Sequence, residues 1–453
     1  MITTDEFTVW LEGFIDYGRN ANKSIDNLKK MEKFARYFGN PQKEFKAIHI
    51  AGSKGKGSVS IMIASILAEA AVFAGLYTSP HVMDFRERIS NSGIFFQDKE
   101  YSDAYEKIIA GFNEIIKKEP LIDPGWFEIV TMTAFLLFAL QKTEWAVIET
   151  GLGGRLDMTN ILNPEISVLT PIELEHCNYL GNTIEEIAFE KAGIIKHKTP
   201  VFCSRQEDEA LKVFKKKAFE TDSSFFYLPE IIKTPIAFSV SEKSLKINIE
   251  FNSENKIGKL FSRTINTELK LLDEVQAENA ALAACTVKYL FPQIKEDIIE
   301  RGLSKAWLPA RFEILSKIPP VIVDGAHTKN SIALCIKTYS KLKLIDKQGV
   351  LIFACAEDKD VKSMAEIFKD KFKKIIITIP GESKKSNIEK TFAEFKDIFQ
   401  NNVQKTVIEK NADYKSVIKN TVSECRLKNL PLLITGSFYL AAEAKTIYNH
   451  LHD

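Results

Sequence analysis

The sequence lacks the charge imbalance and the cysteine patterns that mark several classes of protein. Its 61 basic and 60 acidic residues give a formal net charge of +1, so no excess of positive charge points to nucleic acid or to an anionic membrane surface. Its six cysteines are dispersed, and none stands in a Cys-x-x-Cys pair. This spacing is not that of a disulfide or zinc framework, so we expect reduced and mostly buried thiols.

Signals for export and for membrane insertion are also lacking. Residues 1–7 contain neither the basic region nor the apolar stretch of a signal peptide. No run of apolar residues reaches about 18, the length that crosses a bilayer. We therefore expect a soluble, monomeric, cytoplasmic enzyme that acts on small molecules. We expect no nucleic-acid or membrane partner.

The length of 453 residues predicts two or three domains, because a single hydrophobic core stops growing well below that size. The segment Trp307–Ala310, which contains Pro309, has the character of a link between domains. We predict an ATP-binding domain over residues 1–307 and a smaller domain over residues 308–453. We expect the link to act as a hinge.

Residues 46–60, KAIHIAGSKGKGSVS, are the most informative stretch of the chain. A short apolar strand, in which only His49 is polar, leads into a glycine-rich turn and then into an apolar helix. Glycines let backbone N–H groups face an anion, and the start of a helix favours negative charge. The pattern therefore predicts a phosphate-binding loop formed by Gly52, Ser53, Lys54, Gly55, Lys56, Gly57 and Ser58. Its spacing departs from the common P-loop, since Gly57 stands between Lys56 and Ser58.

The rest of the chain alternates strands with helices, which predicts α/β domains with mainly parallel, doubly wound sheets. Helices are expected over 5–39, 101–117, 126–141, 274–289 and 294–304, and a β-hairpin over 235–252. Strands are expected over 145–149 and 166–170, and residues 75–80 are expected to form a short strand that runs into a loop. A second α/β set is expected after residue 307, with strands at 320–324, 349–354, 373–379 and 431–435, and helices at 328–341, 359–369, 387–399, 411–421 and 438–449. Phe438 and Tyr439 are expected in its core.

Three polar residues follow predicted strands at the edge where the phosphate loop lies: Ser79, Glu149 and His176. Carboxyl ends of parallel strands share one edge of a sheet, and ligands bind there. A carboxylate, a hydroxyl and sometimes an imidazole suit Mg²⁺. Taken singly, Glu149 also fits a salt-bridged acid and His176 an ordinary loop histidine. Likewise, Asp324 fits a helix cap as well as a nucleotide contact, and Arg311 fits a plain surface residue.

These motifs, in this order, closely resemble the folylpolyglutamate synthase/dihydrofolate synthase family of the Mur ligase superfamily. The resemblance runs from about residue 28 to residue 439. Its most specific pieces are ETGLGGRLD at 149–157, within the matched stretch 149–160, and EKAGI at 190–194. Other pieces are AGSKGKGS at 51–58, TSPH at 78–81, FRERI at 85–89, WFE at 126–128, LEH at 174–176, QAENA at 276–280, LPARF at 308–312 and DGAH at 324–327.

The resemblance implies an N-terminal P-loop-type ATPase domain and a smaller, Rossmann-like C-terminal domain. It implies that ATP phosphorylates a substrate carboxylate and that L-glutamate attacks the acyl phosphate. By matched position, Lys56 and Ser58 hold phosphates, and Asn279, Arg311 and Asp324 contact adenine, phosphate and ribose. His327 stands where the family has a histidine facing the site.

The resemblance also implies two Mg²⁺ ions, with Ser79, Glu149, His176 and Lys191 as ligands. In many members the lysine at the position of Lys191 carries a carbamate. This modification converts a cation into an anionic oxygen ligand. We therefore predict that CO₂ carboxylates Lys191. The substrate that bears the pterin is expected to meet Phe127, Glu128, Arg155, Asp157 and Met158.

Several residues depart from the family pattern. Lys54 replaces an Asn in the phosphate loop, and Glu175 replaces an Asp before His176. Thr328-Lys329 replaces Asn-Pro, and Glu274 stands where a His is frequent. Gly125 and Met158 replace a Thr and a small Ala near the expected pterin site, so the preferred folate form stays open.

Two other functions compete with a folate-directed ligase. A cell-wall Mur ligase is disfavoured because only about 45 residues precede the loop, too few for a UDP-binding domain. A catalytically silent nucleotide-binding regulator is disfavoured by the presence of Lys56, Glu149, His176 and Lys191.

Overall fold

The computed structural model describes residues 1–15, 25–241, 243–342, 345, 348–382, 385–400 and 406–451. The chain divides into two compact units. Unit 1 comprises residues 1–237, 247–268 and 276–307, and unit 2 comprises residues 238–246, 269–275 and 308–453. Two short segments that the predicted boundary assigns to the first domain, 238–246 and 269–275, therefore group with unit 2.

Unit 1 is built on a seven-stranded sheet in the order β3-β2-β4-β1-β5-β6-β7. Its strands are parallel except for β3, which runs antiparallel to β2. The mainly parallel α/β prediction is therefore confirmed. The strands are β1 (Lys46–Ala51), β2 (Ala74–Tyr77), β3 (Ile89–Asn91), β4 (Trp145–Glu149), β5 (Ile166–Leu169), β6 (Val201–Cys203) and β7 (Phe225–Tyr227).

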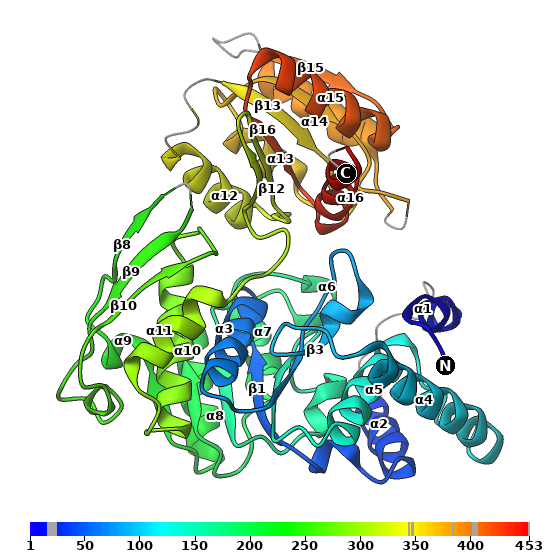
Figure 1. The fold of residues 1–453 in the computed structure, drawn as a ribbon, viewed down its shortest axis with the longest axis vertical. Coiled ribbons are helices and arrows are strands. Elements are labelled where there is room, and N and C mark those ends of the chain that lie inside the picture. The colour runs from blue at the N-terminus through cyan, green and yellow to red at the C-terminus, as the bar shows by residue number, and fades with distance from the viewer. Residues whose placement is uncertain are drawn as a thin grey trace. The chain divides into compact units, whose positions relative to one another are not determined.

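Helices lie on both faces of this sheet, which gives three layers (Figure 1). One face packs against α1 (Thr4–Glu12), α2 (Ile25–Tyr37), α4 (Asp98–Lys118) and α5 (Trp126–Leu140). The remaining helices of this unit are α3 (Lys56–Glu69), α6 (Cys177–Leu180), α7 (Ile184–Ala192), α8 (Asp208–Glu220), α9 (Leu228–Ile231), α10 (Gln276–Leu290) and α11 (Glu296–Lys305). Short 3₁₀ turns cover Pro41–Lys43, Phe85–Arg88, Met158–Ile161 and Gly258–Leu260.

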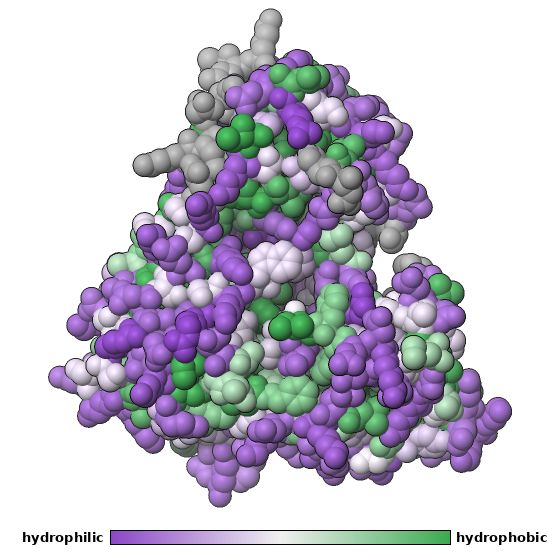
Figure 2. Space-filling model, in the orientation of Figure 1, coloured by the Kyte–Doolittle hydropathy of each residue, from purple (hydrophilic) through white to green (hydrophobic). Residues whose placement is uncertain are grey.

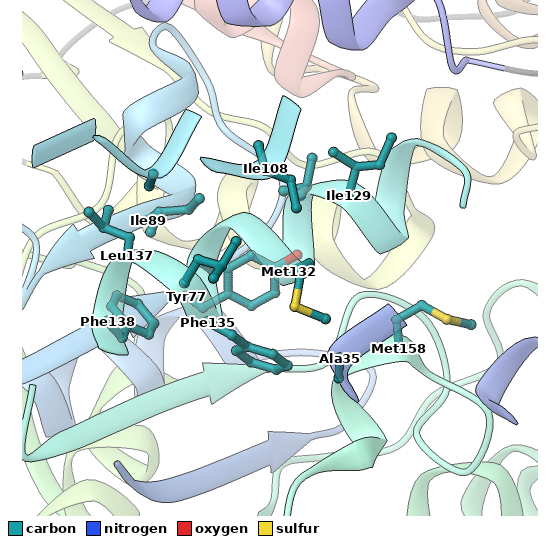
Figure 3. Close-up of a cluster of buried hydrophobic side chains, with 14 of the residues drawn as sticks. Ala35, Tyr77, Ile89, Ile108, Ile129, Met132, Phe135, Leu137, Phe138 and Met158 are labelled. Carbon is teal, nitrogen blue, oxygen red and sulfur yellow. The ribbon is translucent and has the colours of Figure 1, made fainter. Parts of the chain in front are cut away.

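The central strands are buried on both faces because helices cover both sides of the sheet. In β1 every residue after Lys46 is buried, and β4 is buried throughout. Alternate residues of a strand point to opposite faces, and Ala47, Ala146 and Ile148 join the core under α4 and α5. Figure 3 shows this core, with Met132 and Phe135 of α5 near Tyr77 of β2.

Helix α3 is buried on nearly all sides, as expected for a helix that is apolar all round. It packs against α10 and α11. The approach to α11 is close, since a Cβ on Gly302 would lie 2.5 Å from the Ile66 Cα atom. This packing fixes the helix whose first turn forms the end of the phosphate loop.

Strands β8 (Ala237–Val240), β9 (Leu245–Ile249) and β10 (Ile265–Leu269) form a separate three-stranded sheet in the order β10-β9-β8. The alternating pattern of residues 235–252 predicted a hairpin here, and β8 and β9 are neighbours in the sheet. Between them, the Ser241 N–H donates to the Ser244 carbonyl oxygen at 2.9 Å. The sequence pattern did not reveal β10.

Unit 2 contains a six-stranded sheet in the order β11-β12-β16-β13-β14-β15, in which only β11 is antiparallel to its neighbour. The strands are β11 (Glu313–Lys317), β12 (Pro320–Val323), β13 (Gly349–Phe353), β14 (Phe372–Ile377), β15 (Val407–Lys410) and β16 (Leu432–Thr435). The helices are α12 (Lys329–Lys341), α13 (Val361–Ile367), α14 (Ile388–Phe399), α15 (Tyr414–Lys428) and α16 (Phe438–His450). One core joins α12, α13 and α14 to the sheet.

The prediction of a single helix over residues 5–39 is wrong. Helix α1 begins after Thr3, whose hydroxyl accepts from the Glu6 N–H in a capping box, and ends at Glu12, before Gly13. A second helix, α2, begins at Ile25. Part of the predicted helix, residues 16–24, lies outside the described residues.

The surface view is mostly hydrophilic, with hydrophobic side chains in scattered groups (Figure 2). Within the described residues, no helix is long and apolar enough to cross a membrane. The six cysteines are free thiols, and all but the half-buried Cys177 are buried. Tyr439, which we expected in the core of unit 2, is instead exposed.

Candidate active site

The carboxyl edge of the unit 1 sheet gathers the first group of predicted site residues. Strand β1 leads into Gly52, β4 ends at Glu149, and β2 leads into Thr78 and Ser79. The backbone N–H of Ser79 donates to the Glu149 Oε2 atom at 3.2 Å. The structure thus brings Ser79 and Glu149 together, and the Glu149 side chain is buried.

The phosphate loop has the geometry of an anion cradle. Gly55, with φ of +85°, is the N-cap of α3, so Lys56, Gly57 and Ser58 form the first turn of that helix. A side chain at Gly52 would lie 1.9 Å from the Thr170 Oγ1 atom, so the strand end requires glycine. The Lys56 Nζ atom donates to the Gly52 carbonyl oxygen at 3.0 Å, which folds its ammonium group over the loop.

Asn279 lies against this loop from the start of α10. A Cβ on Gly55 would be 2.8 Å from the Asn279 Oδ1 atom. The Asn279 Nδ2 atom donates to the Gln276 Oε1 atom at 2.9 Å, which orients the amide. The family resemblance implies that Asn279 contacts the nucleotide, and the structure places this residue beside the phosphate loop.

Lys54 of the loop and Lys191 beside it share one half-buried carboxylate, that of Glu175. The Lys191 Nζ atom lies 3.1 Å from Glu175 Oε1 and donates to the Gly52 carbonyl oxygen at 2.8 Å. Lys54 lies 3.8 Å from Glu175 Oε2. Burial raises the pKa of Glu175, but Lys191, Lys56 and Lys54 outweigh it and lower this pKa to about 2. Glu175 therefore stays ionised and neutralises part of the positive charge.

His176 follows this carboxylate and adopts a left-handed backbone conformation, with φ of 49°, just before α6. Lys191 lies near the end of α7, and the N-cap of this helix is Thr183. Within the described residues, no group of three or more His, Cys, Asp and Glu side chains is arranged to hold a metal. Any ion here would rely on one or two carboxylates together with hydroxyl, phosphate and water oxygens.

The loop over residues 151–160, which we call the substrate loop, carries three of the expected substrate contacts. Arg155 donates to Glu190 Oε1 through Nη2 at 2.7 Å and keeps 41% of its side chain exposed. Asp157 is fully buried, and Met158 is 4% exposed. Figure 3 shows Met158 beside Ala35 of α2, at the edge of the core.

The other two expected substrate contacts, Phe127 and Glu128, lie half-buried in the first turn of α5. The Phe127 ring packs on the substrate loop, since a Cβ on Gly151 would lie 2.3 Å from its Cζ atom. Phe127 and Gly151 therefore fit each other closely. The first turn of α5 and the substrate loop are neighbours.

Unit 2 gathers a second group at the carboxyl ends of β12 and β16. Asp324 accepts from the Phe312 N–H at 2.7 Å and from the Ala326 N–H at 2.8 Å. The Arg311 guanidinium lies over the Phe438 ring, 4.4 Å from its centroid. Its neighbours Ala310 and Phe312 both have positive φ, 53° and 47°, a strained backbone of the kind that clusters at functional sites.

His327 belongs to the same group. Its Nδ1 atom lies 2.9 Å from the Gly325 carbonyl oxygen. A carbonyl accepts only, so Nδ1 carries the proton and Nε2 is the basic nitrogen. The ring also packs near Phe438, at 5.7 Å between centroids.

Comparison with known proteins identifies the family of the chain. Residues 125–287 match the Mur ligase middle domain, and residues 310–438 match the glutamate ligase domain of Mur ligases. The dihydrofolate synthase/folylpolyglutamate synthase of Bacillus subtilis is 33% identical over 360 residues, which cover 78% of this chain and 80% of the relative. The chain belongs to the folylpolyglutamate synthase/dihydrofolate synthase family.

Solved structures of this family share the fold. The Mycobacterium tuberculosis folylpolyglutamate synthase complexed with ADP and AMPPCP has a TM-score of 0.83 and 25% identity, over 93% of this chain and 95% of that one. A structure described as an FPGS–AMPPCP–folate complex has a TM-score of 0.78 and 26% identity, over 98% of each chain.

Sequence reasoning gave no role to an arginine–histidine pair beside Ser79. The Arg88 Nε atom donates to His81 Nδ1 at 2.7 Å, and the Arg88 guanidinium lies 4.8 Å from the Trp126 ring centroid. Burial, together with the charge of Arg88, lowers the pKa of His81 to about 4. The signal was present in the family motifs at 78–81 and 85–89, which were recognised without assigning these side chains.

Proposed function

We propose that this ATP-dependent ligase adds L-glutamate to dihydropteroate, to folate or tetrahydrofolate, or to both. The products are dihydrofolate or a folylpolyglutamate, with ADP and phosphate. The observation that carries the proposal is the phosphate loop at the start of α3, with Glu149 and Ser79 in contact at the same sheet edge. The family of the chain supports the same reaction.

The chemistry occurs in two steps. A substrate carboxylate oxygen attacks the γ-phosphorus of ATP, the bond to the β-phosphate oxygen breaks, and ADP leaves. The glutamate nitrogen then attacks the acyl carbon, loses a proton, and expels phosphate. Lys56, Lys54 and the N-terminus of α3 stabilise the negative charge of the transferred phosphoryl group.

The residues at the sheet edge fit Mg²⁺. A buried carboxylate, Glu149, lies against the residue that carries the Ser79 hydroxyl, and both offer hard oxygen donors. Mg²⁺ at this place would neutralise phosphate oxygens. We propose Ser79, Glu149 and His176 as ligands of one ion, and a carboxylated Lys191 as a ligand of a second.

Residues of unit 2 complete the proposal. Arg311 is proposed to bind phosphate and Asp324 the ribose, as the family motifs imply. His327, with Nε2 as its basic nitrogen, is proposed to face the reacting groups.

Arg155 at the exposed side of the substrate loop is proposed to contact the pterin-bearing substrate together with Phe127 and Glu128. Asp157 and Met158 are buried, so their proposed contribution is the shape of this loop.

Lys191 is proposed to carry a carbamate, formed when its neutral amine attacks CO₂ and releases a proton. Its ion pair with Glu175 favours the ammonium form, so carboxylation requires that this pair opens. We expect Lys191→Ala to be nearly inactive and to recover partly with acetate, and not with chloride at equal ionic strength. Absence of added CO₂ in mass spectra of trapped protein, with no acetate rescue, would leave Lys191 as a cation.

Phosphate release tests the proposed reaction. We expect release only when ATP, glutamate and either dihydropteroate or tetrahydrofolate are all present. Release with a UDP-linked cell-wall substrate instead would indicate a Mur-type ligase, and nucleotide binding without turnover would indicate a silent regulator. The relative rates with the two folate acceptors give the balance of activities, and light scattering tests the expected monomer.

A further inference from the structure

His49 is a buried polar residue that the proposed chemistry does not use. It lies in the middle of β1, three residues before the phosphate loop, and its side chain has no exposed surface. In the sheet it stands opposite Ile148 of β4 and Ser167 of β5. A fully buried imidazole in an otherwise apolar strand needs a partner to offset its desolvation.

A chain of two hydrogen bonds supplies that partner. The His49 Nε2 atom lies 2.9 Å from the Thr159 Oγ1 atom, and this hydroxyl donates to the Asp157 Oδ1 atom at 2.7 Å. A threonine hydroxyl has one proton. Because that proton goes to the carboxylate, the His49 Nε2 atom must be the donor to Thr159.

The direction of the hydrogen bond from His49 to Thr159 fixes which nitrogen of the imidazole carries the proton. Nε2 carries the proton, and Nδ1 is an acceptor without a hydrogen-bond partner in the described part of the chain. Burial lowers the pKa of His49 to about 3, despite the charge of Asp157. The ring is therefore neutral, and it acts as a fixed hydrogen-bond donor.

The carboxylate at the other end of the chain closes the substrate loop. Asp157 Oδ2 accepts from the Leu152 N–H at 2.9 Å, and Oδ1 accepts from the Thr159 N–H at 3.1 Å. These bonds join the two ends of the loop across the segment that contains Arg155. The orientation of this carboxylate therefore sets the shape of the loop.

We propose that His49 is a positioning residue that ties the strand of the phosphate loop to the substrate loop through Thr159 and Asp157. It does not touch the reacting atoms. Its effect is to hold the substrate loop in a fixed position relative to β1, the strand that leads into the phosphate loop. The inference rests on the proposed function, because that function assigns the substrate loop to the folate acceptor.

Two pairs of variants separate this role from simple packing. His49→Leu removes the donor, whereas His49→Gln keeps an N–H at the position of Nε2. Thr159→Val removes the hydroxyl, whereas Thr159→Ser keeps it. We expect His49→Leu and Thr159→Val each to raise the KM for the folate acceptor by about 3- to 10-fold, the effect of one lost hydrogen bond, with the KM for ATP changed less than about twofold.

The conservative variants and the double variant sharpen the test. We expect His49→Gln and Thr159→Ser to keep the KM for the folate acceptor within about twofold of the original enzyme. The double variant with His49→Leu and Thr159→Val should cost no more than the larger single effect, because both changes break one chain of bonds. Equal KM values in all variants, or additive effects, would overturn the proposal.

Two measurements test the link without activity. Nitrogen NMR of histidine-labelled protein, with His49→Gln to assign the signal, should show a neutral ring protonated at Nε2, and protonation at Nδ1 would contradict the proposal. Hydrogen exchange over residues 151–160 should be faster in His49→Leu than in His49→Gln, and equal rates would contradict it. An inactive original enzyme with both expected signals would reject the proposed function while supporting the link.

Discussion

Glu149 combines burial with a position at the end of an apolar strand. A buried carboxylate is costly unless a charge or a donor compensates it, and the Ser79 N–H lies at 3.2 Å. We expect Glu149→Gln to leave the fold intact and to lower turnover at least about 100-fold, because the amide cannot supply the negative charge that a cation requires.

The residue just before this strand offers a control for the substitution. Glu144 precedes β4 and is exposed, so Glu144→Gln should keep turnover within about twofold, as is usual for surface changes. The measurement is steady-state phosphate release at saturating Mg²⁺, with thermal unfolding to check the fold. Unchanged turnover in Glu149→Gln would remove Glu149 from the site.

In unit 2 the half-buried Asp273 interacts electrostatically with the buried Asp324. Burial and the neighbouring Asp324 raise the pKa of Asp273 to about 7, although Thr338 donates a hydrogen bond at 2.8 Å and Arg311 opposes the rise. The native carboxyl therefore holds a proton that the unfolded chain releases between pH about 4 and 7. Stability should fall as pH rises through this window and stay low above it.

Replacing this carboxyl should remove that dependence. We expect Asp273→Asn to flatten the pH profile and to raise the Tm of unit 2 at pH 8 by about 2 to 4 °C, the shift for about 1 kcal/mol in a domain of this size. Asn keeps an acceptor for Thr338. The matched control is Asp397→Asn, at an exposed site on α14. If the stability of both variants depended on pH in the same way, the raised pKa of Asp273 would not be the cause of the dependence.

Among the structural elements, the phosphate loop depends on a glycine whose backbone and surroundings both exclude a side chain. Gly55 has φ of +85°, and a Cβ there would meet Asn279 at 2.8 Å. Gly39 has φ of +77° with nothing within 4 Å of the added carbon. Both changes to Ala cost about 1 to 2 kcal/mol of backbone strain, but only Gly55→Ala displaces Asn279.

The two glycines therefore form a matched pair. We expect Gly39→Ala to lower the Tm without changing the KM for ATP. Gly55→Ala should lower the Tm and raise the KM for ATP about tenfold or more, an effect of about 1.4 kcal/mol. Equal KM values in the two variants would show that the loop tolerates the side chain.

Elements with a local signal were predictable from the sequence. The predicted strand at 145–149 coincides with β4, and glycines with an apolar run located the start of α3. The error at α1 arose because the apolar pattern was extended past Gly13, although Thr3 and Glu6 form a local cap. Strands β7, β11 and β15 escaped prediction because they are short and partly exposed, and only pairing with distant strands defines them.

The candidate site was likewise predictable only in part. Backbone-driven features, such as the phosphate loop and the positions of Ser79 and Glu149 after strands, follow from topology. The pairing of Lys191 and Lys54 with Glu175, and the packing of Arg311 on Phe438, involve side chains far apart in the sequence. Periodicity carries no information about such contacts, so Phe438 was assigned to the core.

For the whole molecule, the predicted nucleotide contacts are divided between the units, with Lys56 and Asn279 in unit 1 and Arg311 and Asp324 in unit 2. We expect AMPPCP to slow hydrogen exchange in two separate stretches, residues 52–58 and residues 310–327. Lys56→Ala should weaken protection in both, since one nucleotide is expected to contact both stretches. Protection confined to unit 1 would contradict the roles of Arg311 and Asp324.

The order of strands in unit 2 has a consequence for biosynthesis. Strand β16, residues Leu432–Thr435, follows the other five strands of this sheet in the sequence and lies between β12 and β13 in the sheet. A ribosome therefore completes the other five strands of this sheet before its middle exists. A nonsense mutation between the codons for β15 and those for β16 would delete the central strand, and the exposed edges of β12 and β13 would invite aggregation.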